Sequence, residues 1–597
     1  MLLNERDLSF LLYEFLDTQA LLERERYAEH DRSVFDATLA TARQVAAEFF
    51  APHNHKADQH EPTFDGERVT LIPETRHAWD AFADAGFLAA HHDFADGGLQ
   101  LPEVLLRACM AYFNAANIAT TGYPFLSIGA ANLIKSFAAP EVQQRFLPAM
   151  FAGRFSGTMA LTEPGQGSAL GDLRTRAVPA EDGTYRVFGQ KMFISGGDHE
   201  LTENIVHLVL ARIEGAPAGV KGISLFVVPK FNVDADGALG TRNDVALAGL
   251  LHKMGYRNTT STVLSFGEGA GAVGYLVGEA NKGLGYMFQM MNEARIGVGL
   301  GAASLAYQSY LHALDYARER PQGRLASCKD PATRQVPIIE HADVRRMLLM
   351  QKAYAEGSLA LCLYASSLVE DAHTGTTAQA RDDAAQLLDL LTPMVKTWPS
   401  RYGLVASDLG IQILGGAGYT REYPLEQLYR DNRLNPIHEG TEGIQALDLL
   451  GRKLGLKGGR GYTLFLTQVE DSLQQAARLE HCQPLARHLA KGLTVLREVT
   501  AALQQQVAED VDRGLANATA YLDLFGRVLV GWVWLRQAML AEAALSQGAQ
   551  GAEADFYRGK LHTARYYLEW ELAVLPGIAQ LLCAGNRSCH DMQNHWF

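Results

Sequence analysis

The sequence predicts a mainly helical protein in which a β domain is inserted between two helical domains and a further helical domain follows. Apolar residues recur at three- and four-residue steps over most of the chain, which is the pattern of helices with one buried face. Between about Ser156 and Met287, glycine becomes dense and short β-branched or aromatic runs appear. A chain of 597 residues is too long to fold around one ordinary hydrophobic core. At roughly 150 residues per domain, it is expected to form about four domains.

Composition narrows the class of protein. Hydrophobic residues make up 48% and charged residues 20%, as in folded globular proteins. The net charge of -14 and pI near 5.8 lack the basic surplus of nucleic-acid-binding proteins, so we predict no nucleic-acid partner. The six cysteines contain no CxxC pair, which predicts neither a disulfide framework nor a metal site and fits a reducing cytoplasm. The apolar run Val528–Leu535 is shorter than the roughly 20 residues of a spanning helix, and we interpret it as a buried segment, with no transmembrane helix.

The first two domains are expected at residues 1–155 and 156–287. The first is helical, with Pro and Gly gathered between periodic segments. The second is the β domain, where Asp182-Gly183 stands between alternating segments and predicts a β-hairpin, since such turns need positive φ.

The helical period returns over residues 288–457, with a loop expected at His373–Ala380, and continues in an additional domain at residues 460–597. Two sets of leucine and valine residues in this last domain share helix faces: Leu493, Leu496, Leu503 and Val507, and Leu561, Leu568, Leu572 and Leu575. Because these faces need burial and no Pro or Ser linker precedes them, we expect the region to pack on the preceding domain.

Two segments at the start of the β domain carry candidate binding groups. In the first, Met159–Ser168, the hydroxyls of Thr162 and Ser168 flank a turn of Pro and Gly and could hold a heteroaromatic edge and a phosphate. A plain surface turn is the alternative. In the second, Phe193 and Ser195 are two residues apart and so share one side of a strand. A core Phe beside a solvated Ser is the alternative there.

Two later segments carry glycines and a carboxylate. The clustered glycines of Gln412–Gly418 permit a ligand to approach the backbone closely, although glycines after an apolar helix also form C-caps. In Asn435–Gln445, Glu439 sits between apolar residues and Gly440. A buried carboxylate has a raised pKa and can act as a base near neutral pH, whereas an isolated Glu is ordinarily solvated.

Together with HKMGYRNTTST (252–262) and ARERPQGR (317–324), these four segments resemble the acyl-CoA dehydrogenase family and occur in the family's order. The resemblance covers about residues 156–454 strongly and the N-terminal helices more loosely. The final helical region and the stretch Ile194–Ile213 are similar to the large subgroup that includes 3-methylmercaptopropionyl-CoA dehydrogenases. This resemblance implies the family's fold, which is a helical domain, a β-barrel-like domain and a helical bundle, here with an extra C-terminal helical domain.

The resemblance implies FAD-dependent α,β-dehydrogenation of an acyl-CoA thioester to the trans-2-enoyl-CoA, as in fatty acid β-oxidation. Glu439 would take the α-proton and FAD the β-hydride, and hydrogen bonds from the Glu439 N–H and the flavin's ribityl hydroxyl would stabilise the oxyanion. The family's usual electron acceptor is an electron-transferring flavoprotein. A homodimer or larger homo-oligomer is expected, because the flavin contacts in this family come from two subunits. The expected location is the cytoplasm, as the cysteine pattern indicates.

Individual residues follow from the same resemblance. Arg320 would pair with the pyrophosphate across the dimer interface, and the segment at Gln412 would come from the neighbouring subunit. The implied FAD contacts are Leu161, Thr162, Ser168, Phe193, Ser195, Arg320, Gln412, Gly415, Gly416 and Thr441. The implied substrate contacts are Ser168, Arg295 and Gly440.

The chain departs from the family pattern at several places. Ala169 stands where the first signature commonly has Asp, and Ser195 replaces a Thr. The aromatic residue usual after the arginine of the dimer-contact segment is missing after Arg320. His438 replaces the Tyr that often precedes the base, which changes pocket polarity and leaves the acyl chain length open.

Alternatives remain for the base and for the function. Some relatives place the base directly before the arginine that corresponds to Arg295, but Ala294 occupies that position. Glu293 is one step further away, rotated by about 100°, and we therefore favour Glu439. The functional alternatives are an acyl-CoA oxidase that passes electrons to oxygen, 3-methylthiopropanoyl-CoA as the substrate, and a flavin-free scaffold of the same fold.

Overall fold

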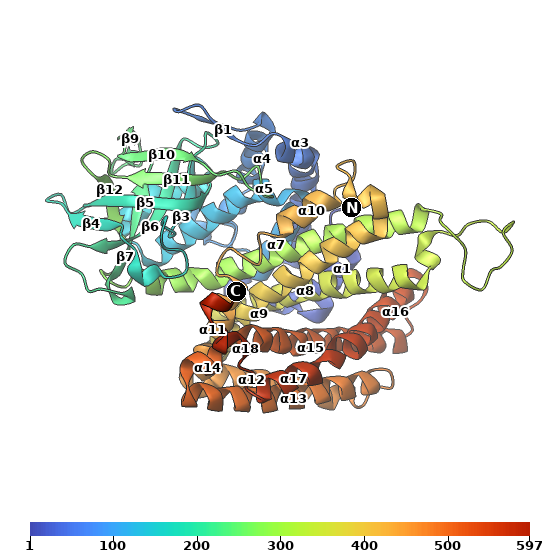
Figure 1. Ribbon diagram of the computed structural model, residues 1–597. Coiled ribbons are helices and arrows are strands. Elements are labelled where there is room, and N and C mark those ends of the chain that lie inside the picture. Colours follow the sequence, from blue (N-terminus) through green and yellow to red (C-terminus); the bar gives the residue numbers. More distant parts are fainter. The chain divides into compact units, whose positions relative to one another are not determined.

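The computed structural model describes residues 1–597, apart from the side chains of Gln289 and Met290 (Figure 1). The chain forms two compact units. The mixed unit, which contains helices and all the strands, consists of Glu29–Ala294 with Leu2. The helical unit consists of Met1, Leu3–Ala28 and Arg295–Phe597.

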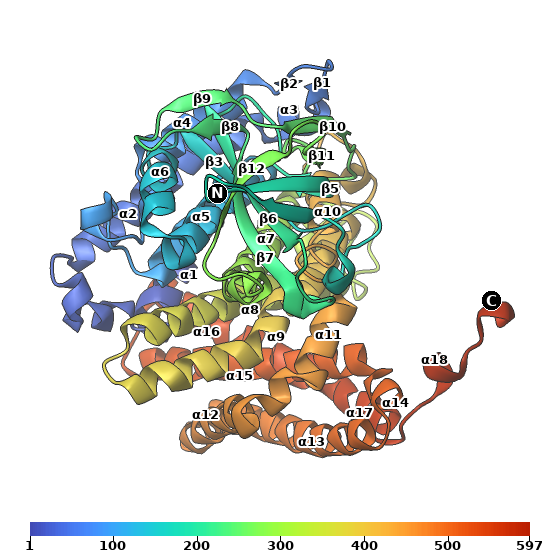
Figure 2. The ribbon, with the colours of Figure 1, turned by 90° about the vertical axis from the view of Figure 1, so that its left-hand side faces the viewer.

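The helices account for most of the chain, as predicted. Those labelled in Figures 1 and 2 are α1 (Glu5–Ser9), α2 (Arg32–Val45), α3 (Asn54–Gln59), α4 (Pro73–Asp84), α5 (Glu103–Phe137), α6 (Pro140–Phe151), α7 (Gly283–Glu319), α8 (Ala342–Thr374), α9 (Ala378–Leu414), α10 (Leu425–Asn432), α11 (Glu442–Gly451), α12 (Arg460–Ala476), α13 (Cys482–Glu509), α14 (Val511–Leu515), α15 (Ala518–Ser546), α16 (Gly551–Tyr566), α17 (Leu575–Cys583) and α18 (Ser588–Asp591). A loop lies within the predicted segment His373–Ala380 but is shorter than predicted, because α8 continues to Thr374 and α9 begins at Ala378.

The mixed unit holds a barrel-like sheet. Its strands are β3 (Phe155–Ala160), β4 (Arg176–Pro179), β5 (Tyr185–Ser195), β6 (Asn204–Ile213), β7 (Ile223–Pro229), β10 (Val245–Leu250), β11 (Ser261–Phe266) and β12 (Ala272–Leu276). They pair in the order β10-β11-β5-β12-β7-β6-β3, and β4 pairs with both β5 and β6. Since β4 joins β5 to β6, the strands β5, β12, β7, β6 and β4 close a ring. The predicted β domain between helical regions is confirmed.

The remaining strands form two small ribbons, in which β1 (Thr63–Phe64) pairs with β2 (Val69–Thr70) and β8 (Phe231–Val233) pairs with β9 (Leu239–Arg242). The predicted hairpin at Asp182-Gly183 is also confirmed, because it joins the antiparallel strands β4 and β5. Gly183 has φ 79°, and the Asp182 carboxylate accepts a hydrogen bond from the Thr184 N–H at 2.9 Å.

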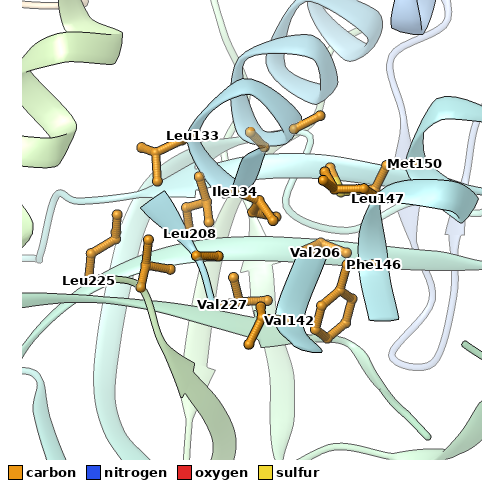
Figure 3. Packing of buried hydrophobic residues seen from close by; sticks show 14 of the residues in the cluster. Leu133, Ile134, Val142, Phe146, Leu147, Met150, Val206, Leu208, Leu225 and Val227 are labelled. Carbon is orange, nitrogen blue, oxygen red and sulfur yellow. The ribbon is translucent and has the colours of Figure 1, made fainter. Parts of the chain in front are cut away.

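A hydrophobic core fastens the sheet of the mixed unit to two of its helices. Leu133 and Ile134 of α5 and Phe146 of α6 meet Leu208 of β6 and Val227 of β7 (Figure 3). Strand β6 is buried along eight of its ten residues, which explains its continuous apolar sequence in place of an alternating one. This core holds β3 and β6 in place, so the loop that leaves β3 starts from a rigid base.

Helix α15 lies at the centre of the C-terminal helices. All residues of the run Val528–Leu535 are buried, as predicted, and the Trp534 indole donates to the Ala353 carbonyl of α8 at 3.1 Å. In the described part of the chain, α15 is the one helix long and apolar enough to cross a membrane, but 67% of its most apolar window is buried within the structure. A core helix passes the same test of length and composition. The expectation that residues 460–597 pack on the preceding helices is confirmed.

Residues 3–28 belong to the helical unit, a placement that the sequence did not indicate. Asp7 forms a buried ion pair with Lys560 of α16, and its other oxygen accepts a hydrogen bond from the Tyr307 hydroxyl at 2.8 Å. Lys560 also binds the Glu356 carboxylate at 2.9 Å. This buried cluster ties the first residues of the chain to α8 and α16.

Candidate active site

The first two signature segments lie side by side in the mixed unit. Leu161 and Thr162 follow β3, and the Thr162 carbonyl accepts a hydrogen bond from the Met192 N–H of β5 at 2.9 Å. Phe193 has φ 60° and 63% of its side chain is exposed, while Ser195 is also exposed. The pairing of β5 with β11 shifts register here, which accommodates the left-handed residue. The alternative of a core Phe is therefore wrong, and the ring is free to contact a ligand.

A buried ion pair joins the same two segments. Lys191 is 0% exposed and Glu163 is 6% exposed, and their Nζ and Oε1 atoms are 3.0 Å apart. Lys191 also donates to the Leu161 carbonyl at 2.9 Å, while Glu163 accepts hydrogen bonds from the N–H groups of Arg174 and Thr175. The pair fixes the shape of the loop that carries Thr162. Sequence reasoning missed both residues, although opposite charges within two neighbouring motifs were a usable signal.

Glu163→Gln is expected to lower flavin retention, because it leaves the Lys191 ammonium buried beside a neutral amide. Removing one partner of a buried pair costs about 3–5 kcal/mol, and the loop that loosens carries the proposed flavin contacts. The measurement is the ratio of FAD to protein after gel filtration, with the thermal midpoint beside it. Asp182→Asn is the matched control, since its ion pair with Arg186 is exposed. A Glu163→Gln protein with one FAD per chain and an unchanged midpoint would contradict this role.

Ser168 lies on the exposed loop after this turn. Glu163 and Gln166 exchange backbone hydrogen bonds of 2.9 and 3.0 Å, which makes the tight turn that the proline and glycine predicted. Two glycines of the loop, Gly165 and Gly167, have no atom within 4 Å of the position a Cβ would take. The loop therefore has open space on which a phosphate-bearing ligand can approach the backbone.

The glycine segment of the helical unit ends α9. Gly415 has φ 60° and forms the C-cap of the helix, as the alternative interpretation expected. A Cβ at Gly415 or Gly416 would meet no atom within 4 Å, so the turn also remains open to a ligand. Gln412 and Arg320 are both exposed, and in the described part of the chain no hydrogen bond or ion pair joins either to Glu439. The two interpretations of this segment are compatible.

Glu439 lies in the loop between α10 and α11. It is half-buried and has φ 54°, and Gly440 follows with φ 86°. Thr441 is the N-cap of α11, and its hydroxyl accepts a hydrogen bond from the Ile444 N–H at 3.4 Å. The Gln445 side chain donates to the Glu439 carbonyl at 2.9 Å. These contacts hold two consecutive left-handed residues in a conformation that an isolated chain avoids.

Two cations of the helical unit, Arg295 and Lys396, act electrostatically on the Glu439 carboxyl. Burial raises the pKa of Glu439, and the positive charges of Arg295 and Lys396 oppose that rise. Arg295 is buried and pairs with Asp448 at 3.0 Å. Among the described residues, the Glu439 carboxylate accepts no hydrogen bond from the protein, and its backbone N–H donates none. A half-buried carboxylate that has a raised pKa and accepts no hydrogen bond from the described residues is suited to receive a proton.

His438, which replaces the family's usual Tyr, is half-buried. Its Nε2 lies 3.0 Å from the Asn435 side-chain oxygen, and burial lowers its pKa to about 3. The ring is therefore neutral near pH 7. It adds a polar group beside Glu439 without adding a charge.

Glu293, the alternative base, has other partners. Within the mixed unit, its Oε2 accepts a hydrogen bond from the Asn132 amide at 3.1 Å and lies 3.9 Å from the Arg107 guanidinium. Burial raises the pKa of Glu293 as well, with the Glu103 charge adding to the effect. A raised pKa alone therefore does not separate the two acids. Hydrogen bonding separates them, because the Glu293 carboxylate accepts a hydrogen bond from Asn132, whereas the Glu439 carboxylate accepts none from the described residues.

Four family models match the chain in order. They are the N-terminal domain (residues 35–154), middle domain (158–268) and C-terminal domain (281–454) of acyl-CoA dehydrogenases, and an acetyl-CoA dehydrogenase C-terminal-like domain (465–593). The chain is 36% identical to a 3-methylmercaptopropionyl-CoA dehydrogenase of Ruegeria pomeroyi, covering 94% of this chain and 95% of that protein. It is 35% identical to a broad-specificity linear acyl-CoA dehydrogenase of Mycobacterium tuberculosis, covering 97% of each.

Solved structures share the fold. An acyl-CoA dehydrogenase complexed with FAD from Bacillus anthracis has a TM-score of 0.74 at 20% identity, over 92% of this chain and 88% of that one. In the mixed unit, the exposed Phe193 ring and the open glycines Gly165 and Gly167 are suited to contact a flavin. In the helical unit, the open glycines Gly415 and Gly416 are suited to such a contact as well. The matches along the whole length show that this chain belongs to the acyl-CoA dehydrogenase family of FAD-dependent oxidoreductases.

Proposed function

We propose that this chain converts a saturated acyl-CoA thioester to the trans-2-enoyl-CoA, with Glu439 as the base that removes the α-proton. The observation that carries the proposal is the Glu439 carboxylate, which is partly buried, has a raised pKa and accepts no hydrogen bond from the described residues. A raised pKa brings a carboxylate closer to the pH at which it must both hold and release a proton.

The residues around Glu439 would support this transfer. One carboxylate oxygen receives the proton, and the positive charge of Arg295 favours the ionised carboxylate that must accept it. The uncommitted N–H of Glu439 donates to the thioester oxygen, where negative charge develops. Arg295 and Gly440 would contact the substrate, and the neutral ring of His438 precedes the base in the same loop.

FAD would be held by Leu161, Thr162, Ser168, Phe193 and Ser195 of the mixed unit. Arg320, across the dimer interface, and Gln412, Gly415 and Gly416 would come from the helical unit of a neighbouring subunit, and Thr441 would touch the flavin just after the base. When bound, the flavin supplies the acceptor for the hydride from the β-carbon. Phe193 offers an open ring face for packing, and the turn at Gly415 offers exposed backbone.

We also propose a homodimer or larger homo-oligomer in the cytoplasm, with an electron-transferring flavoprotein as the electron acceptor. The step is the one that opens β-oxidation of fatty acids. Since relatives include a 3-methylmercaptopropionyl-CoA dehydrogenase and butyryl-CoA dehydrogenases, short acyl groups with or without sulfur are the first candidate substrates.

The test is a panel of saturated acyl-CoAs, from butyryl-CoA to long chains with 3-methylthiopropanoyl-CoA included, assayed with a dye acceptor. We expect enoyl-CoA formation with at least one short substrate and flavin bleaching under anaerobic conditions. Release of hydrogen peroxide without a dye would favour the acyl-CoA oxidase alternative. A colourless protein that takes up no FAD would favour the flavin-free scaffold.

A further inference from the structure

Lys396 is a buried lysine of α9 that no predicted role explains. Its side chain is 0% exposed, and its Nζ donates a hydrogen bond to the Gly440 carbonyl at 2.8 Å. In the described part of the chain, it forms no ion pair with a carboxylate. Burying an ammonium group is costly unless nearby negative charge or hydrogen bonding compensates for it.

The charges that face Lys396 come from three elements. Glu439 in the loop before α11 and Glu442 in α11 act on it as negative charges, and Arg295 of α7 acts as a positive one. Burial is the largest influence and lowers the pKa of Lys396 to about 8. The ammonium is therefore still mostly protonated at neutral pH, and Glu439 is one source of compensation.

Arg295 is less available for the same task. Its guanidinium lies 3.0 Å from an Asp448 oxygen, and Asp448 also binds Arg452 at 2.7 Å. Part of the positive field of Arg295 is thus neutralised by its own partner. Of the two cations that act on Glu439, Lys396 is the one without a carboxylate contact of its own.

Lys396 also acts on the backbone of the loop. Its Nζ donates a hydrogen bond to the Gly440 carbonyl, and the Gln445 side-chain amide donates one to the Glu439 carbonyl at 2.9 Å. These two residues have φ 86° and 54°. A left-handed conformation at a residue other than glycine persists where its surroundings hold it. The same ammonium is therefore placed to set both the geometry and the charge of Glu439.

We propose that Lys396 is a positioning residue for the Glu439 base: its hydrogen bond to Gly440 fixes the loop, and its charge keeps the carboxylate ionised. This inference rests on the proposed function of Glu439. It assigns to α9 a role in proton abstraction that is separate from the flavin contacts at the end of the same helix.

The test is the pH dependence of kcat/KM for Lys396→Met, which keeps the aliphatic stem and removes both charge and donor. Loss of a nearby positive charge disfavours a carboxylate, so the acidic limb of the profile should move up by about one pH unit. At pH values below the Glu439 pKa of both proteins, kcat/KM of the variant should be about tenfold lower than that of wild type. This loss should vanish at high pH, where Glu439 is ionised in both proteins.

Lys453→Met is the matched control, because Lys453 is also buried in the helical unit but pairs with Asp389 at 3.2 Å. Its acidic limb should not move. Lys396→Gln retains a donor without a charge, and it should show the same shifted limb as Lys396→Met with a higher plateau at high pH. If Lys396→Met does not fold as a yellow protein, Lys396→Gln decides the question.

An acidic limb that stays in place in a folded, FAD-containing Lys396→Gln or Lys396→Met protein would overturn the proposal. A loss of activity that is equal at all pH values would do the same, since it would indicate a structural role only. Glu439→Gln separates this failure from failure of the proposed function. Normal turnover in Glu439→Gln refutes the base assignment, whereas an inactive Glu439→Gln with an unmoved Lys396 profile refutes only the role of Lys396.

Discussion

Glu439→Gln is expected to reduce acyl-CoA dehydrogenation at least ~10²-fold, and up to ~10⁴-fold, which is the usual range for a positioned general base. The substitution keeps the shape of the side chain and removes its ability to take the α-proton. Folding and flavin binding should persist, since no hydrogen bond from the described residues reaches this carboxylate. The measurements are turnover with a dye acceptor, the flavin absorbance and acyl-CoA binding, which should be retained or tighter.

Glu293→Gln is the control, because Glu293 has its own partners in Asn132 and Arg107 and should lose much less activity. A Glu439→Gln protein that is yellow, folded and near-normal in turnover would show that the base assignment is wrong. Glu293 would then be the first residue to test.

Ending the chain after Gly459 is expected to abolish the stable fold of the helical unit. The cut uncovers large side chains that now pack on the C-terminal helices: Phe10 meets Phe556 at 5.5 Å between ring centroids, and Trp398 meets Tyr567 at 6.0 Å. Each large apolar side chain returned to water costs about 1.5–3 kcal/mol, against a total stability of about 5–15 kcal/mol. Asp7 would also lose Lys560 while buried.

The readouts for this truncation are soluble yield, the thermal midpoint and size in gel filtration. A chain that ends after Arg587 is the matched control, since residues 588–597 are all exposed and extend away from the other C-terminal helices in Figure 2. Its midpoint should match that of the whole chain. A protein ending at Gly459 that is as stable and as oligomeric as the whole chain would contradict the packing described here.

Local patterns were sufficient for much of the fold. Helical periodicity and the dense glycines of residues 156–287 correctly predicted the inserted β domain, and Asp182-Gly183 correctly predicted a hairpin. These features depend on neighbours within a few residues, so a sequence contains them directly. The burial of Val528–Leu535 followed from its length, which is too short for a membrane.

The contacts around the candidate site could not be predicted from local sequence patterns, because the fold brings distant residues together. Lys191 and Glu163 are 28 residues apart, and Lys396 and Gly440 are 44 apart, so no local pattern pairs them. The left-handed φ of Phe193 depends on a register shift against β11, which only strand pairing produces. The flavin, substrate and base residues stay predictions, because their roles depend on bound molecules and, in the proposed oligomer, on a second subunit.

The helical unit draws its residues from both ends of the chain, Leu3–Ala28 and Arg295–Phe597, whereas the mixed unit is almost continuous. A ribosome therefore finishes the mixed unit first. At about 5–20 residues per second, Lys560 emerges roughly 30–110 s after Asp7 has been made. Throughout that time Phe10, which is fully buried in the finished protein, lacks its ring partner Phe556 of α16. We therefore expect the nascent chain to depend on a holding chaperone at its N-terminal end, and the helical unit to close only after translation is nearly complete.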